Sequence, residues 1–258
     1  MSQLKQSEWY DQWKMFRDEE LFLFQDWIYP NTLDDFIDKE ILECGCGGGQ
    51  HTAFMAPYAK KITAVDLNTI EIAREINRDY DQVEFVESDI ASMDLKRKFD
   101  IVISIGVVHH TDDPDETVRN MIRHLKVGGK LILWVYSEEG NFLVKHVVEP
   151  MRKMFLRNRK RSELLHLSRI ITAGMYFPVY SLYLLPLKFL PYYQYFGNFR
   201  KLSFDRNMLN VYDKLNAPQV EFISRSRIMS WFGDSFEKVH VSPYKGVSWR
   251  GSAVRRGK

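Results

Sequence analysis

A run of glycines directly after a predicted buried strand is the feature that most constrains this chain. The strand is predicted over residues 40–44, and the segment from Glu43 to Gly49 reads Glu-Cys-Gly-Cys-Gly-Gly-Gly. Glycine lets a backbone turn tightly and approach a ligand without a Cβ in the way. A helix is predicted over 50–58, immediately after the loop. The order of strand, glycine loop and helix is typical of an α/β fold that binds a nucleotide.

Strands and helices alternate through the following hundred or so residues and again near the end of the chain. Helices are predicted over 69–80 and from Pro114 to about Leu125, where Gly128 and Gly129 end the second one. The further strands are predicted at 61–66, 83–86, 99–105, 130–136, 236–241 and 247–254. This pattern predicts a Rossmann-like, doubly wound α/β fold with a mostly parallel, seven-stranded sheet.

One domain with embellishments is expected, because a chain of 258 residues that is 45% apolar can bury a single core of this type. We divide it into an N-terminal helical cover, a cofactor-binding core, a helical insertion and a segment that completes the sheet. These parts are residues 1–37, 38–139, 140–211 and 212–258.

The acidic residue that ends the second predicted strand indicates which kind of nucleotide the loop would bind. Asp66 lies 23 residues after Glu43, where a carboxylate accepts hydrogen bonds from ribose hydroxyls. A dinucleotide fingerprint that began at Gly45 would require Gly or Ala at position 50, and this chain has Gln50. Binding of a nucleoside without pyrophosphate is therefore favoured, and an NAD-dependent enzyme is the alternative.

With Glu43, Gly45, Gly47 and Gly49 in an acidic-x-Gly-x-Gly-x-Gly loop, and Asp66 after it, the chain resembles class I S-adenosylmethionine (SAM)-dependent methyltransferases. The resemblance covers residues 38–136 and 220–254. It implies SAM as cofactor and S-adenosylhomocysteine (SAH) as product. The cofactor-binding residues that it implies are Glu43, Gly45, Gly47, Gly49, Asp66, Leu67, Asp89, Ile90 and Ile105. Asp89 and Ile90 would meet the adenine, although an Asp in this place also often caps a helix.

Two adjacent histidines follow the strand predicted at 99–105, where the resemblance places the methyl-transfer site. A hydroxyl acceptor must lose a proton, and His109 or His110 is a candidate base if its pKa lies near neutrality. The alternative is that one histidine faces the cofactor or a backbone carbonyl and the other packs. The pair does not have the spacing of metal ligands on a helix, and no metal is expected.

Aromatic residues near the N-terminus, with Trp9, Tyr10 and Trp13 foremost, are predicted to close over the site together with the insertion. Within the insertion, residues 150–161 are basic and residues 170–187 contain no charged side chain. Pro178 and Pro186 oppose a transmembrane helix, and one crossing would not let the chain return to its sheet. A peripheral membrane contact, a lid over an apolar substrate and a homodimer interface remain open; a lid or an interface is favoured.

The acceptor is suggested only by further resemblances. Segments 134–141, 216–218 and 246–250 are similar to little-characterised bacterial methyltransferases encoded near surface-polysaccharide genes, and the core is similar to quinone-biosynthesis methyltransferases. We therefore hypothesise methyl transfer to a hydroxyl of a small-molecule, lipid-linked or saccharide acceptor. The alternatives are C- or N-methylation of an apolar aromatic acceptor, and a SAM-binding protein without catalysis.

The net charge bears on the binding partners of the protein, and the N-terminal sequence bears on its location in the cell. A net charge of +2 gives no reason to expect a nucleic-acid partner. The N-terminal sequence lacks the apolar core of a signal peptide, and Cys44 and Cys46 have neither disulfide nor zinc spacing. A cytoplasmic protein is expected, with peripheral attachment to a membrane left open.

Overall fold

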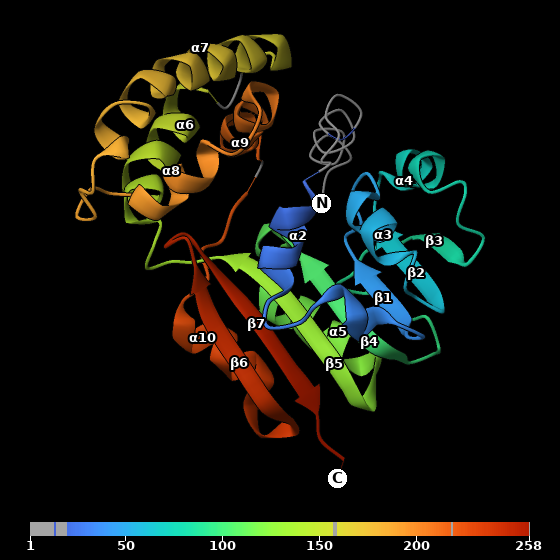
Figure 1. Ribbon diagram of the computed structural model, residues 1–258. Helices are drawn as coiled ribbons and strands as arrows, with labels where there is room; N and C mark the ends of the chain where they lie inside the picture. The colour runs from blue at the N-terminus through green and yellow to red at the C-terminus, as the bar shows by residue number, and fades with distance from the viewer. Residues whose placement is uncertain (1–12, 14–19, 157–158, 218, 258) are drawn as a thin grey trace.

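The computed structural model describes residue 13 and residues 20–156, 159–217 and 219–257 (Figure 1). In this part of the chain one seven-stranded sheet has the order β3-β2-β1-β4-β5-β7-β6. The strands are β1 (Glu40–Cys44), β2 (Lys61–Asp66), β3 (Val83–Glu87), β4 (Phe99–Ile105), β5 (Leu125–Tyr136), β6 (Phe236–Tyr244) and β7 (Ser248–Arg255). The pairs from β3 to β5 are parallel, and β7 is antiparallel to both of its neighbours. The predicted Rossmann-like α/β fold is confirmed.

The core has two layers, one on each face of the sheet, because successive side chains of a strand point to opposite faces. Ile41 packs in a cluster with helices α2 (Leu21–Ile28), α3 (Gln50–Met55) and α4 (Ile70–Ile76). Leu42 belongs to the opposite cluster, with α5 (Pro114–Arg123) and α10 (Arg225–Phe232). Both faces of the central strands β2 and β4 are therefore buried, which explains why their sequences are mostly apolar, whereas the edge strand β3 is only half-buried.

The turn between α5 and the body of β5 differs from the prediction. Helix α5 ends at Arg123 and β5 already begins at Leu125, so Gly128 and Gly129 lie inside an irregular strand rather than ending a helix. The register with β4 shifts here, Gly128 has φ +75°, and a Cβ on Gly129 would lie 2.9 Å from the carbonyl oxygen of Asp100. The glycines are needed because the strand bulges against its neighbour.

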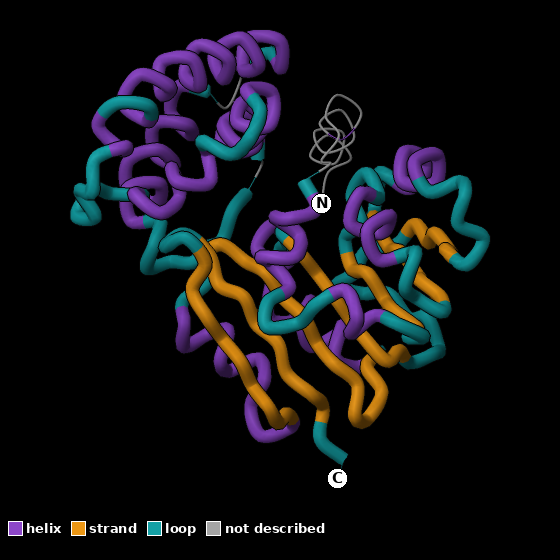
Figure 2. The backbone as a smooth tube through the Cα atoms, viewed as in Figure 1, coloured by secondary structure: helices purple, strands orange, loops and turns teal. Residues whose placement is uncertain are grey.

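Helices between β5 and α10 form a lobe beyond the carboxyl end of β5, and the tube view shows the same separation from the sheet (Figures 1 and 2). We call residues 140–216 the insertion lobe. Its elements are η3 (Val144–Val148), α6 (Glu149–Phe155), α7 (Arg161–Val179), η4 (Leu182–Leu184), α8 (Tyr193–Phe199) and α9 (Phe204–Asn216). The boundary predicted at residue 211 thus falls inside α9. Helices α7 and α9 pack together through Leu164, Tyr212 and Leu215.

The apolar stretch 170–187 does not form one continuous helix, in agreement with the prediction from its prolines. Helix α7 ends at Val179, directly after Pro178, and a short η4 turn follows. Across the described ranges, no helix combines the length and the apolar character needed to cross a membrane.

Candidate active site

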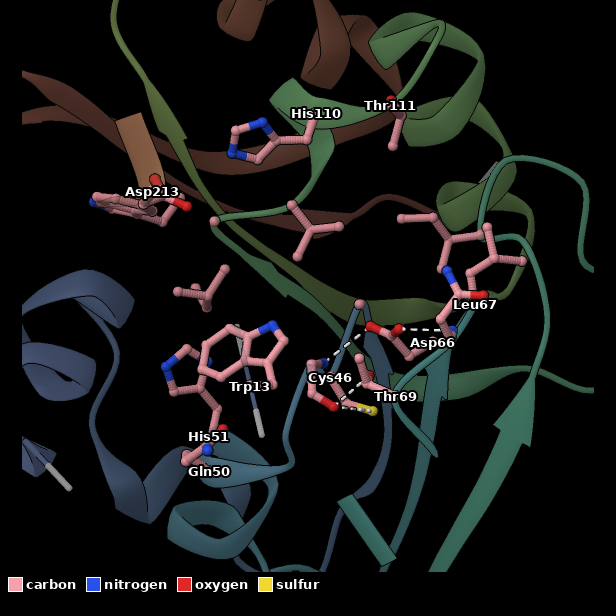
Figure 3. A pocket seen from close by; sticks show the side chains of 18 of the residues that line it. Trp13, Cys46, Gln50, His51, Asp66, Leu67, Thr69, His110, Thr111 and Asp213 are labelled. Carbon is pink, nitrogen blue, oxygen red and sulfur yellow. Dashed lines mark hydrogen bonds between the residues drawn. The ribbon is translucent and has the colours of Figure 1, made fainter. Parts of the chain in front are cut away.

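One cavity of about 280 Å³ lies at the carboxyl ends of β1, β2, β4 and β5, the edge at which ligands of open α/β sheets bind (Figure 3). Nine of the predicted residues line it: Trp13, Gly45, Gly47, Asp66, Leu67, Asp89, Ile90, Ile105 and His110. Glu43, Gly49 and His109 are not part of its lining. Trp9 and Tyr10 lie outside the described residues.

The glycine loop is shaped by close approach at two positions. Gly45 has φ +82°, and a Cβ there would lie 2.5 Å from the Val107 side chain. Gly47 has φ +54°, and a Cβ there would lie 2.8 Å from Cε2 of Trp13. Trp13 therefore sits on the loop inside the cavity, with its ring near His51 in Figure 3. A side chain at either glycine would push apart the segments that enclose the site.

Gly49 lies outside the cavity lining, at the start of α3. It is the N-cap residue of α3 with φ +83°, and a Cβ there would lie 2.9 Å from the Cα of Ala73 in α4. The Asn77 side chain donates to the Gly49 carbonyl oxygen at 2.9 Å. Gly49 thus allows α3 and α4 to pack closely, and it supports the loop without touching the cavity.

Asp66 ties the end of β2 to the glycine loop. Its carboxylate accepts hydrogen bonds from the backbone N–H of Gly47 at 2.9 Å and of Asn68 at 3.2 Å. The Thr69 hydroxyl donates to the Gly47 carbonyl oxygen at 2.5 Å. The two loops that follow β1 and β2 are therefore held together at the cavity wall, with a carboxylate between them.

Asp89 and Ile90 form the next part of the wall. The exposed Asp89 carboxylate accepts from the Ala91 backbone N–H at 2.9 Å, so it orders its own loop while it lines the cavity. Ile90 is buried, and the Asn120 side chain donates to its carbonyl oxygen at 3.0 Å. The backbone of Ile90 is thereby held in place, and its side chain gives the wall an apolar surface beside the polar Asp89.

Glu43 lies beneath the loop rather than in the cavity. Its side chain is 3% exposed and accepts from the Thr52 hydroxyl at 2.5 Å. Burial raises the pKa of the Glu43 carboxyl to about 7, with the Asp66 charge acting in the same direction. Near neutral pH this carboxyl is therefore poised between its neutral and charged forms.

Gln50, which entered the sequence argument only against a dinucleotide, lines the cavity. Its Nε2 atom is buried and has no hydrogen-bond partner within the described part of the chain. Such a donor is costly unless a ligand or water satisfies it. Gln50 is thus a candidate binding residue that sequence reasoning missed, and its position at the start of the helix after the glycine loop was the available signal.

The two histidines are separated by the fold. His109 is fully buried and packs between the rings of His110 and Tyr136, each with a centroid 4.3 Å away. Burial lowers the pKa of His109 well below its ordinary value. His110 lines the cavity, and its Nδ1 atom lies 2.8 Å from the carbonyl oxygen of Gln219. Burial also lowers the pKa of His110, and the charge of Asp213 acts in the opposite direction.

A polar wall from the insertion lobe closes the remaining side. The cavity-lining residues of α9 share one face of the helix, at positions i, i+3, i+4 and i+7: Arg206, Leu209, Asn210 and Asp213. The Tyr136 hydroxyl donates to Asp213 Oδ2 at 3.2 Å, and Arg206 donates to Asn210 Oδ1 at 2.9 Å. Figure 3 shows His110 and Asp213 across the cavity from Asp66 and Cys46. The helical spacing of the four α9 residues was the signal that the sequence analysis did not use.

Among the described residues, no three His, Cys, Asp or Glu side chains are grouped so that they could hold a metal ion.

Comparison with known proteins identifies the fold's family. Residues 42–133 match the model of the methyltransferase domain family, which spans the glycine loop, Asp66, Asp89 and both histidines. This segment therefore matches the class I SAM-dependent methyltransferases. The resemblance drawn from the acidic-glycine loop is therefore confirmed, and the seven-stranded sheet is that of a methyltransferase.

Curated relatives of this methyltransferase include two ubiquinone biosynthesis O-methyltransferases. That of Rickettsia conorii is 28% identical over 108 residues, which cover 41% of this chain and 37% of the relative. That of Xanthomonas oryzae pv. oryzae is 35% identical over 113 residues, which cover 41% of this chain and 46% of the relative. The matched part thus spans less than half the length of either relative.

Solved structures extend the likeness over the whole fold. The N-methyltransferase NodS from Bradyrhizobium japonicum, solved with SAH, has a TM-score of 0.53 at 11% identity and covers 97% of this chain and 100% of its own. An O-methyltransferase family protein from Burkholderia thailandensis has a TM-score of 0.55 at 13% identity and covers 92% of this chain and 57% of its own. At these identities the likeness concerns the fold alone.

Proposed function

We propose that this protein transfers the methyl group of SAM to a hydroxyl of a small-molecule or lipid-linked saccharide acceptor. The observation that carries the proposal is that one cavity brings together the glycine loop and Asp66 on one side and His110 with the polar face of α9 on the other. A cofactor site and an acceptor site joined in one enclosure are what a group transfer requires.

The cofactor side suits SAM. The unpartnered Nε2 of Gln50 is a donor for the carboxylate of an amino acid, and Asp66 is an acceptor for ribose hydroxyls. Ile90 gives an apolar surface to the adenine, with Asp89 as the neighbouring acceptor. When bound there, SAM supplies a methyl group that its sulfonium already activates.

His110 is the base in this proposal. In the neutral ring, Nδ1 carries the proton that is donated to the Gln219 carbonyl oxygen, so Nε2 is the acceptor nitrogen. Its lowered pKa keeps the ring neutral near pH 7 and able to take the proton of a hydroxyl. The Asp213 carboxylate favours the charged ring that results. His109 lies outside the cavity lining, so the proposal does not assign it this role.

The chemistry of the acceptor side favours a hydroxyl-rich molecule. Arg206, Asn210 and Asp213 offer hydrogen-bond donors and acceptors, while Trp134 and Tyr136 offer flat aromatic faces. A sugar presents hydroxyls around its edge and C–H groups on its faces, and it can use both. An apolar aromatic acceptor would exclude water from the polar α9 side chains and offer them no further hydrogen bonds, so C- or N-methylation of such an acceptor is the second candidate.

A transfer assay with methyl-labelled SAM tests the proposal. The acceptor panel holds nucleotide sugars and lipid-linked saccharides, catechol-type aromatics, and amines, and mass spectrometry checks each product for one added methyl group. Labelled sugar that is lost in His110→Gln, with SAH affinity retained, supports the proposal. Label on an amine or on a ring carbon contradicts hydroxyl transfer, and SAH binding without any product across the panel favours a binding protein.

A further inference from the structure

Charge is divided unevenly between the insertion lobe and the rest of the chain. Residues 140–216 contain thirteen Lys and Arg and four Asp and Glu, a formal net charge of +9. The remaining residues contain 23 basic and 30 acidic side chains, a net charge of −7. The total of +2 conceals this division. The lobe therefore carries a local positive field that the whole-chain charge does not reveal.

Exposed apolar side chains are concentrated in the same lobe. Twenty large apolar side chains are exposed in the described part of the chain, and thirteen of them lie within residues 140–216. Phe177 and Phe189 are 82% and 80% exposed. Clustered exposure of this kind marks an interaction surface in a soluble protein.

Some of these exposed side chains lie around a second cavity, of about 260 Å³. Phe142 and Leu143, which precede η3, line it together with residues 188 and 190–194 of the loop and of α8. Lys188 and Lys245 line the same cavity, and neither forms an ion pair with another residue of the described chain. Exposed apolar side chains here surround two cationic groups.

We propose that the insertion lobe binds the surface of a membrane that contains anionic lipids. Phe177 and Phe189 enter the interfacial region, and Lys188 and Lys245 meet lipid phosphates. Apolar anchors beside lysines are the elements of interfacial attachment, which needs no spanning helix. This inference rests on charge and exposure and does not depend on the proposed methyl transfer.

The exposed apolar side chains of the lobe fit neither of the two alternatives that the sequence favoured. Helix α9 of the lobe closes one side of the main cavity, but of the described residues in 140–203 none lines it, so the exposed apolar side chains there do not cover the acceptor site. A symmetric homodimer through the lobe would place the same patch against itself, and therefore a net charge of +9 against +9. An anionic bilayer complements this charge and also accepts the phenylalanines.

The position of the lobe gives the attachment a consequence for the site. The lobe lies beyond the carboxyl end of β5, at the same edge of the sheet as the active-site cavity (Figure 1). Attachment through the lobe would hold the cavity close to the lipid surface. An acceptor with a lipid anchor could then be presented from the bilayer itself.

Sedimentation of the full chain with vesicles tests the proposal. We expect binding to phosphatidylcholine vesicles that contain phosphatidylglycerol, weak binding to phosphatidylcholine alone, and loss of binding as salt is raised. Lys188→Gln and Lys245→Gln should each lower the partition coefficient about fivefold. The double variant Phe177→Ser/Phe189→Ser should lower it by at least about tenfold.

The matched control is Val127→Ser, which removes an exposed apolar side chain outside the lobe and should bind vesicles as the parent does. Unchanged affinity for SAH in every variant shows that the fold is retained. Absence of binding to anionic vesicles overturns the proposal. So does a dimer in light scattering that the phenylalanine variant dissociates, or tight binding of a single-stranded oligonucleotide without vesicle binding.

Discussion

The Nδ1 atom of His110 lies 2.8 Å from the carbonyl oxygen of Gln219, and the Gln219 side chain donates back to the His110 carbonyl oxygen at 3.2 Å. This reciprocal pair joins the segment after β4 to the segment after the insertion lobe, 109 residues later. It also fixes which ring nitrogen of His110 carries the proton in the neutral form. The base of the proposed reaction is therefore oriented by a part of the chain that comes after the acceptor wall.

Replacement of His110 by Gln should lower kcat by about 10²–10⁴-fold, the usual contribution of a general base. Affinity for SAH should stay unchanged, because the cofactor residues lie across the cavity. Since burial holds the pKa of His110 below its ordinary value of 6.5, the parent should keep its activity as the pH falls toward 6.5. A rate profile of kcat against pH checks this, and an acid limb that begins above pH 7 would contradict it.

His109 should make the protein sensitive to acid. Its folded pKa lies well below 6.5, so the unfolded chain binds the extra proton, and stability present above pH 6.5 is lost as the pH falls. The cost is about 1.4 kcal/mol per pH unit below 6.5. His109→Phe, which keeps a ring in a fully buried place, should reduce this dependence. Denaturant unfolding at pH 7.5 and pH 5.5 measures it; equal slopes in parent and variant would show that His109 does not titrate.

Glu43 should make the stability of the fold depend on pH in the opposite direction. Its folded pKa of about 7 lies above the ordinary 4.5, so its stabilising contribution is present below pH 4.5 and is lost as the pH rises through 7. Glu43→Gln retains an oxygen that can accept from Thr52 and removes the charge. We expect the variant to be about 2–3 kcal/mol more stable than the parent at pH 8 and nearly equal at pH 4.5. A variant that is less stable at pH 8 would mean that the charged form is stabilised in the fold.

Local sequence patterns predict most of the fold and the cofactor side of the site. The apolar strands, the glycine loop and Asp66 follow each other within about thirty residues, and parallel strands bring their carboxyl ends to one edge. Each of these residues could therefore be placed from its neighbours in sequence. The fold assigned through Glu43, Gly45 and Asp66 is the one the structure has.

The acceptor side depends on contacts that no local pattern contains. Helical spacing predicts that Arg206, Asn210 and Asp213 share a face, but it does not state what that face meets. The apolar stretch at 170–187 stands out in the sequence because it contains no charged side chain, whereas α9 is the helix of the lobe that reaches the cavity. Similarly, adjacent histidines look equivalent in sequence, and only the packing of Tyr136 against His109 separates them.

The carboxylates of the cofactor side should differ in their effect on binding. Asp66 joins the two loops at the cavity wall, whereas the exposed Asp89 bonds only its own loop among the contacts described. Asp66→Ala should weaken SAH binding by about 1–3 kcal/mol, because it removes a ribose acceptor and the bond to Gly47. Asp89→Ala should cost less, and Asp94→Ala, an exposed carboxylate paired with Lys96 outside the cavity, should cost nothing measurable. Calorimetric titration of SAH into the three variants compares them directly. Equal losses in all three would indicate a general effect of surface charge and would remove Asp66 from the proposed ribose contact.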